Sequence, residues 1–168
     1  MDTAAEIKKV LKEFLGANPN LPITVTVMSV QGDSCTVKLL SGLDLPDVRL
    51  KATVNEDEDS LLIVPKIGSE VIVMSQTGEL SSLMVIKVDA VEKIVYKKAD
   101  FEFVVDGTTK KVTIKNGTAN LGVLMNNLID AISTAQIICP NGPGTINLTT
   151  VEQLNQIKTM FNLILNIN

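Results

Sequence analysis

From Ile23 to about Val95 the chain alternates apolar and polar side chains with a period of two, which is typical of β-strands. A turn at Gln31-Gly32-Asp33 joins the first two alternating stretches, which predicts a hairpin. Further strands are predicted in DVRLKATV, SLLIVP, EVIVMSQ and LSSLMVIKV, which are separated by turns that carry Gly or Pro. About five short strands of this kind indicate a small, closed or partly closed β-barrel over residues 21–95.

The residues before the barrel predict a helix. In TAAEIKKVLKEFLG, Thr3 and Glu6 have the spacing of a capping box, one apolar stripe follows, and Gly16 is a natural stop. Two prolines then fix an extended entry into the first strand. We therefore expect an N-terminal helix and linker over residues 1–20, and this charged amphipathic helix does not have the composition of a signal peptide.

Residues 96–120 predict a second, smaller β region. FEFVV and KKVTIKNG alternate, and Asp106-Gly107 between them is a tight-turn signal. A lone two-stranded hairpin is only marginally stable, so this one must pack on something. The segment carries five lysines against three acidic residues. A solvated face explains this excess most simply, and a docking face for an acidic partner is the alternative.

The last stretch, 121–168, contains only three charged residues, Asp130, Glu152 and Lys158. LGVLMNNLIDAISTA places apolar residues at steps of three and four, which predicts a helix, and CPNGPG reads as a turn-rich linker. Thr149 and Glu152 have capping-box spacing at the start of a second helix. Both apolar stripes are too wide for a two-stranded seam, which favours a multi-chain helical bundle. The predicted oligomer interface consists of Leu121, Leu124, Leu128, Ile132, Leu154, Ile157, Phe161 and Ile164.

The residues that most catalytic and metal sites require are missing. The chain has no histidine, and its two cysteines, Cys35 and Cys139, match no metal or redox spacing, so both are expected to be free thiols. Neither a phosphate-binding glycine loop nor a Gly-x-Ser-x-Gly elbow is present. The acidic run 55–59 does not fit an EF-hand loop, because Ser60 and Lys66 stand where Gly and Glu are needed. We predict no catalytic residue, no cofactor and no metal.

The barrel composition argues against nucleic acid as a ligand. Residues 21–95 carry six basic and eleven acidic residues, a net charge of −5, and no Phe, Tyr or Trp. Barrels that bind single strands use a positive groove and aromatic stacking platforms, and both are missing here. No nucleic-acid partner is therefore predicted.

The order of these segments, and above all IVPKIGSEVIV at residues 63–73, resembles the oligonucleotide/oligosaccharide-binding (OB) barrel of phage baseplate spike proteins. Related barrels occur in Mu-like tail spikes, baseplate V proteins and the spike hubs of contractile injection systems. In that family the barrel trimerises about the tail axis, and the strands that follow wrap into an intertwined β-prism. The resemblance covers about residues 21–120.

The resemblance implies a virion structural protein of a tail baseplate or spike, assembled in the bacterial cytoplasm. Its expected partners are two further copies of itself and tail-tube or hub proteins. Family spikes that puncture membranes often end in a tapered β-helix with a histidine-bound metal, whereas this chain has no histidine and ends in predicted helices. Membrane contact is therefore not predicted. The tip is the only part of the molecule at which the resemblance allows such contact. The alternatives are a soluble OB-type module that binds a saccharide or peptide and dimerises through its helices, or, less favoured, an enzyme with an unrecognised site.

Overall fold

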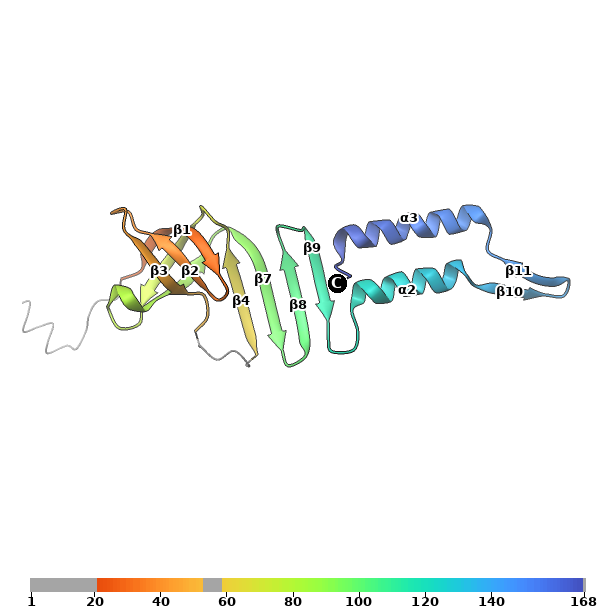
Figure 1. The fold of residues 1–168 in the computed structure, drawn as a ribbon, viewed down its shortest axis with the longest axis horizontal. Helices are drawn as coiled ribbons and strands as arrows, with labels where there is room; N and C mark the ends of the chain where they lie inside the picture. The colour runs from red at the N-terminus through yellow and green to blue at the C-terminus, as the bar shows by residue number, and fades with distance from the viewer. Residues whose placement is uncertain (1–20, 53–58, 168) are drawn as a thin grey trace, which may run out of the picture. The chain divides into compact units, whose positions relative to one another are not determined.

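The computed structural model describes residues 21–52 and 59–167. The described residues form two compact units, one within 21–52 and 64–90 and the other within 59–63 and 91–167. The predicted helix over 3–16 lies outside the described residues, as does most of the acidic run 55–59. The described residues are mainly β-structure, as predicted, and they include the two helices expected within residues 121–168 (Figure 1).

The first unit is a closed barrel of five strands in the order β1-β2-β3-β6-β5, and β5 pairs back onto β1. All neighbours are antiparallel except β3 and β6, which run parallel and meet at Arg49 and Met84. A 3₁₀ turn, η1 (Leu80–Ser82), leads into β6. The barrel strands are β1 (Ile23–Gln31), β2 (Ser34–Lys38), β3 (Asp44–Arg49), β5 (Glu70–Ser75) and β6 (Leu83–Val88). This confirms the predicted barrel and the hairpin between β1 and β2.

Inward-facing β-branched residues fill the barrel. Val27, Val37 and Val73 have no exposed surface, and Val25 and Val71 beside them are almost as buried. Val residues suit strands because their branched side chains pack well on a pleated surface. The alternation that predicts the strands therefore also selects the side chains that form the core. The barrel completes this core with its own residues.

One strand that we expected in the barrel lies elsewhere. β4 (Ser60–Pro65) begins a separate four-stranded sheet in the order β4-β7-β8-β9. The physical reason is that β6 pairs directly with β3 and closes the barrel, which leaves no edge for β4. The expected barrel range 21–95 is interrupted accordingly, since residues 59–63 and 91–95 belong to the second unit.

The sheet of the second unit contains β7 (Val91–Lys98), β8 (Phe101–Asp106) and β9 (Lys111–Lys115). The hairpin predicted at Asp106-Gly107 is present, and β7 adds to it as a third strand. Asp106 accepts hydrogen bonds from the backbone N–H groups of Thr108 and Thr109 at 2.9 and 3.0 Å. Gly107 donates to the carbonyl of Glu92 at 2.7 Å, and a Cβ at Gly107 would lie 2.6 Å from that oxygen. The turn therefore needs glycine for this close approach.

Two helices, α2 (Leu121–Ser133) and α3 (Leu148–Ile164), pack against each other. The expected capping box at Thr149 is wrong, because Asn147 caps α3 by accepting from the N–H of Thr150 at 2.8 Å. Asn at this position is a strong N-cap residue, and its extended backbone conformation starts the helix one residue later, at Leu148.

The linker expected between the helices is also wrong, because it forms a β-hairpin of β10 (Gln136–Cys139) and β11 (Gly142–Thr145). Pro140 and Asn141 make the two-residue turn, and Gly142 follows with a φ of 118°. Glycine adopts such a conformation without steric cost, which explains how a segment rich in turn residues pairs as strands.

The C-terminal residues attach the helices to the sheet. Leu165 forms a parallel bridge with Val112 on β9, and the N–H of Asn166 donates to the carbonyl of Val112 at 2.9 Å. The side-chain amide of Asn166 donates to the Thr113 hydroxyl at 3.2 Å. A Cβ at Gly122 would lie 2.6 Å from the Asn166 carbonyl oxygen, so glycine lets α2 begin close to this segment. The helices therefore start and end beside β9.

Candidate interaction surface

The strand register separates the side chains of the second unit's sheet by face. Directly paired residues share a face, as Tyr96 with Phe103 and Val104 with Thr113 do. One face, called here the apolar sheet face, has Glu92 and Lys98 only at its ends. Its other members are Ile94, Tyr96, Phe101, Phe103, Val105, Val112 and Ile114. The protein has five aromatic residues, and three of them, Tyr96, Phe101 and Phe103, lie on this face.

The opposite face carries most of the charge and is called the charged sheet face. Its residues are Lys93, Val95, Lys97, Glu102, Val104, Asp106, Lys111, Thr113 and Lys115. Lys93 pairs with Asp106 at 3.4 Å and Lys115 with Glu102 at 3.5 Å across neighbouring strands. The Thr109 amide, together with Lys93, holds the pKa of Asp106 below its usual value. This face thus has four lysines and two acidic residues, and the two cross-strand pairs leave an excess of positive charge. Its charged side chains suit contact with water, while Val104 and Thr113 between them are buried.

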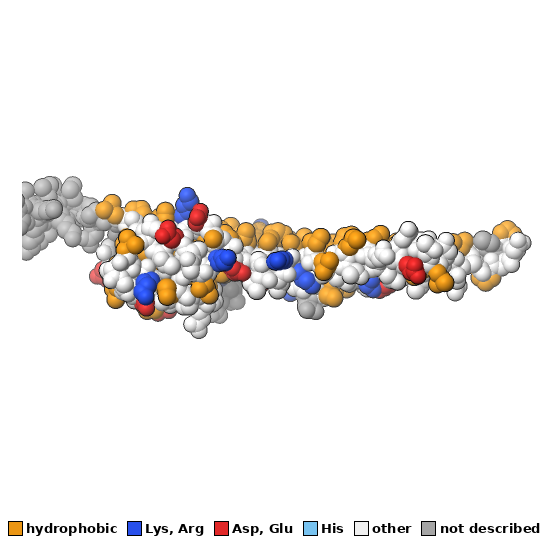
Figure 2. Space-filling view, turned by 90° about the horizontal axis from the view of Figure 1, so that it is seen from above, with side chains coloured by type: hydrophobic (Ala, Val, Ile, Leu, Met, Phe, Trp, Pro, Cys, Tyr) orange, Lys and Arg blue, Asp and Glu red, His pale blue; other side chains and the backbone are white. Residues whose placement is uncertain are grey.

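The apolar sheet face is not covered by a second layer in the described part of the chain. The helices contact the sheet chiefly at β9, and Tyr96 and Phe101 remain 37% and 39% exposed although their rings meet edge to face at 6.2 Å. A sheet with one apolar face needs a partner layer to remove that face from water. Figure 2 shows hydrophobic side chains gathered along one edge of the second unit.

The helices present a second uncovered apolar region. On α2 the side chains of Leu124, Leu128 and Ile132, spaced four residues apart, are 52%, 53% and 42% exposed. Ile129, on the other side of α2, is buried instead. On α3, Ile157, Met160, Leu163 and Ile164 are all exposed. We call these exposed residues of the two helices the helix stripe. The packing of α2 against α3 does not bury this apolar surface.

A shallow groove joins the apolar sheet face to the helix stripe. Its volume is about 220 Å³, and most of its surface is apolar. Phe101 and Ile114 come from the sheet, and Leu121 and Leu124 come from α2. Lys115, Asn116 and Ala119 complete the lining. The apolar sheet face, the groove and the α2 residues of the helix stripe therefore form one continuous apolar surface of the second unit.

The predicted interface residues divide into two groups in this structure. Leu124, Leu128, Ile132, Ile157 and Ile164 are exposed and belong to the helix stripe. Leu121, Leu154 and Phe161 are half-buried within the unit. The sequence reasoning missed the apolar sheet face. The sequence nevertheless contains the information needed. Apolar residues alternate in all three strands, and once β7 is recognised as a strand they lie opposite one another across the sheet.

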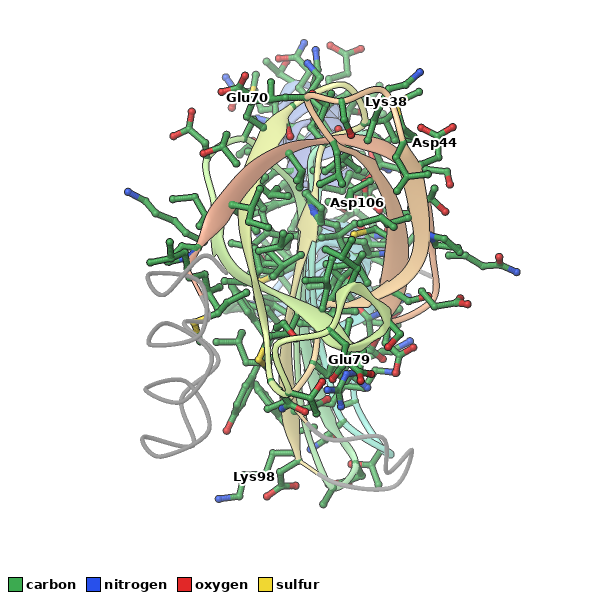
Figure 3. The ribbon with its side chains drawn as sticks, turned by 90° about the vertical axis from the view of Figure 1, so that its left-hand side faces the viewer. Lys38, Asp44, Glu70, Glu79, Lys98 and Asp106 are labelled. Carbon is green, nitrogen blue, oxygen red and sulfur yellow. The ribbon has the colours of Figure 1, made fainter. Side chains whose placement is uncertain are left out.

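The barrel offers no comparable surface among the described residues. One depression of about 200 Å³ is lined by Thr24, Glu70, Lys87 and Asp89 and by two apolar strand residues. It is smaller than the roughly 300–1,000 Å³ of typical small-molecule sites. Charged residues such as Glu70, Lys38 and Asp44 lie on the outside of the barrel (Figure 3). The exterior of the barrel in the described ranges therefore mixes charged residues with single exposed apolar residues such as Leu40 and Ile67, and its depression is shallow.

The other reactive groups within residues 21–52 and 59–167 form no site for chemistry. Burial raises the pKa of the Cys35 thiol to about 11, which makes it an inert core residue. No group of three or more Cys, Asp or Glu residues in these ranges is arranged to hold a metal ion. None of the described helices has the length and hydrophobicity that crossing a membrane would require. Comparison with protein-family models, curated proteins and solved structures finds no match to this chain.

Proposed function

We propose that the protein is a non-enzymatic, homotrimeric structural component of the tail baseplate or spike of a phage or phage-like injection device. The observation that carries this proposal is the continuous apolar surface of the second unit, formed by the apolar sheet face, the groove and the α2 residues of the helix stripe. A continuous apolar surface of this kind is typical of an obligate protein interface.

The barrel supports the comparison with OB-type spike barrels. Numbered along the chain, its strands are ordered 1-2-3-5-4, and the third and fifth run parallel. This is the arrangement of OB barrels. The net charge of −5 over residues 21–95 and the absence of aromatic residues there favour a structural use of the barrel over nucleic-acid binding. Its exterior, which carries both charged and exposed apolar side chains, is available for docking to tail-tube or hub proteins.

Three-fold assembly gives the second unit the layer that it lacks. Three copies that turn their apolar sheet faces inward enclose a prism with an apolar interior and leave the charged sheet faces in water. The helix stripes then meet in a bundle that continues from the prism. Every exposed residue of the predicted interface is buried in such an arrangement, so sheet and helices act together.

The mass of the purified full chain in solution tests the proposal. Light scattering should give about 54 kDa, three times the 18.1 kDa of one chain. A dimer would favour the alternative, a ligand-binding module that dimerises through its helices, and a stable monomer at micromolar concentration would refute assembly altogether. Mass spectrometry of purified tails should then detect three copies, or a multiple of three, in each particle; absence of the chain from tails contradicts the tail assignment.

A further inference from the structure

The hairpin of β10 and β11 is exposed and carries no charge. Residues 131–151 contain no Asp, Glu, Lys or Arg. Within this stretch Ile138 is 90% exposed, Leu148 80% and Ile137 51%. Figure 1 shows the hairpin at the end of the helix pair that is remote from β9. Such large aliphatic side chains at a projecting end are costly to leave in water.

The two isoleucines point to opposite sides of the hairpin. Ile138 pairs with Pro143, and Ile137 pairs with Gly144, so successive pairs alternate between the two faces. A protein that docks on a two-stranded ribbon covers one face and leaves the other in water. A lipid interface surrounds the ribbon and covers both faces. The exposure of isoleucines on both faces therefore favours lipid over a second copy or another protein.

We propose that this hairpin inserts into the interfacial region of a lipid bilayer and gives the protein a membrane-contacting end. Each strand has four residues and is about 14 Å long, much shorter than the roughly 30 Å hydrocarbon core. A two-stranded ribbon also has unpaired backbone groups along both edges, which hydrocarbon does not satisfy. The hairpin therefore inserts to the depth of the head groups and the first acyl carbons.

The charges of the helices limit the insertion. Asp130 on α2 binds Lys158 on α3 at 2.7 Å, and Glu152 lies in the first turns of α3. These groups remain in water, so only the hairpin and the adjoining helix ends enter. The hairpin has no basic residue, so its binding is expected to depend on apolar burial and not on anionic lipid.

The chain has no tryptophan, so a single introduced indole reports on the hairpin alone. Asn141→Trp places it in the turn between β10 and β11. On titration with unilamellar phosphatidylcholine vesicles, we expect a blue shift of the tryptophan emission and flotation of the protein with the vesicles. Adding Ile138→Asp to this reporter should weaken partitioning by about tenfold to a hundredfold, because one exposed isoleucine is replaced by a carboxylate. Leu40→Asp is the matched control, since Leu40 is 96% exposed on the barrel, and it should leave partitioning unchanged.

Several results would overturn the inference. The first is that the protein fails to float with the vesicles, and the second is that the Ile138→Asp variant partitions as strongly as the reporter without it. The third is a tryptophan emission that is already blue-shifted without lipid and does not change when lipid is added, which would show that the hairpin contacts protein. Binding that needs phosphatidylglycerol and disappears in salt would assign the contact to lysines outside the hairpin. Lipid binding does not require the proposed trimer, and light scattering of the same samples reports the trimer separately.

Discussion

Replacing Leu124 and Leu128 together by Asp tests whether the helix stripe holds the assembly together. The two side chains are 52% and 53% exposed in one chain, so a partner removes about half of each from water. With full burial of a leucine stabilising by about 1.5–3 kcal/mol, the variant forfeits about 1.5–3 kcal/mol per chain and about 5–9 kcal/mol per trimer. Unpaired carboxylates in the same place add a desolvation cost of several kcal/mol each. The lost apolar burial and the desolvation cost together are a large fraction of the free energy that holds a typical assembly together. We therefore expect the variant to dissociate or to associate with much lower affinity.

Light scattering over a concentration series measures the effect, and circular dichroism reports whether the β-structure survives. The matched control is Leu40→Asp with Leu43→Asp on the barrel, because Leu43 is also 52% exposed and the chemistry is identical. The control should remain a trimer. If the α2 variant keeps the trimer mass at the lowest concentrations measured, the stripe faces water in the assembly and the reasoning is wrong.

Gly107→Ala should destabilise the second unit by roughly 1–3 kcal/mol in thermal melting, because its Cβ would lie 2.6 Å from the Glu92 carbonyl oxygen. Gly144→Ala is the control, because the nearest atom to its Cβ is 3.7 Å away, and it should melt at the wild-type temperature. Because hydrogen bonds from the turn lower the pKa of Asp106, its contribution is complete above the ordinary carboxyl pKa and is lost as the pH falls through the lowered value. Asp106→Asn should therefore reduce the melting temperature at pH 7 and converge with the wild type in acid; a difference that persists unchanged contradicts the linkage. The Cys35 thiol should resist alkylation at pH 8 in the native protein, as peptide mass mapping will show, because a pKa of about 11 leaves only about one thiolate in a thousand. Fluorescence anisotropy should detect no binding of single-stranded DNA at physiological salt, and a low-micromolar dissociation constant would contradict the charge argument.

The barrel was predictable because its signals are local. Apolar residues at alternate positions mark β1, β2 and β5, and glycine marks turns between strands. Gly32, with a φ of 61°, lies where the sequence predicts the first hairpin. The partner of each strand is not a local property. β4 has the same apolar composition as its neighbours, and only the parallel pairing of β3 with β6 shows that the barrel closes without it.

The candidate site was predictable for the helices and not for the sheet. The spacing of Leu124, Leu128 and Ile132 identifies one side of a helix from the sequence alone. An apolar sheet face depends instead on the register of three strands, because a shift by one residue exchanges the faces. Tyr96 and Phe103 become neighbours only once that register is known. The hairpin at Ile138 was missed for a similar reason, since its turn residues resemble those of a linker.

The two units differ in how completely each buries its own core, and this difference supports the assembly that we propose. Eight residues of the barrel core are 0–3% exposed, so the barrel needs no further layer. Among the described apolar residues of the second unit, only Val104 and Ile129 are buried to a similar degree, while Tyr96 and Phe101 on the sheet and Leu124 and Leu128 on α2 remain accessible. A unit with an incomplete core gains stability from a partner that covers it, and this gain rises with the logarithm of the partner's concentration once binding is substantial, whereas a complete barrel has no such dependence. In the assembly that we propose, copies therefore associate through the second unit. The barrel does not depend on that association for its own core, and its outer surface remains available to other components.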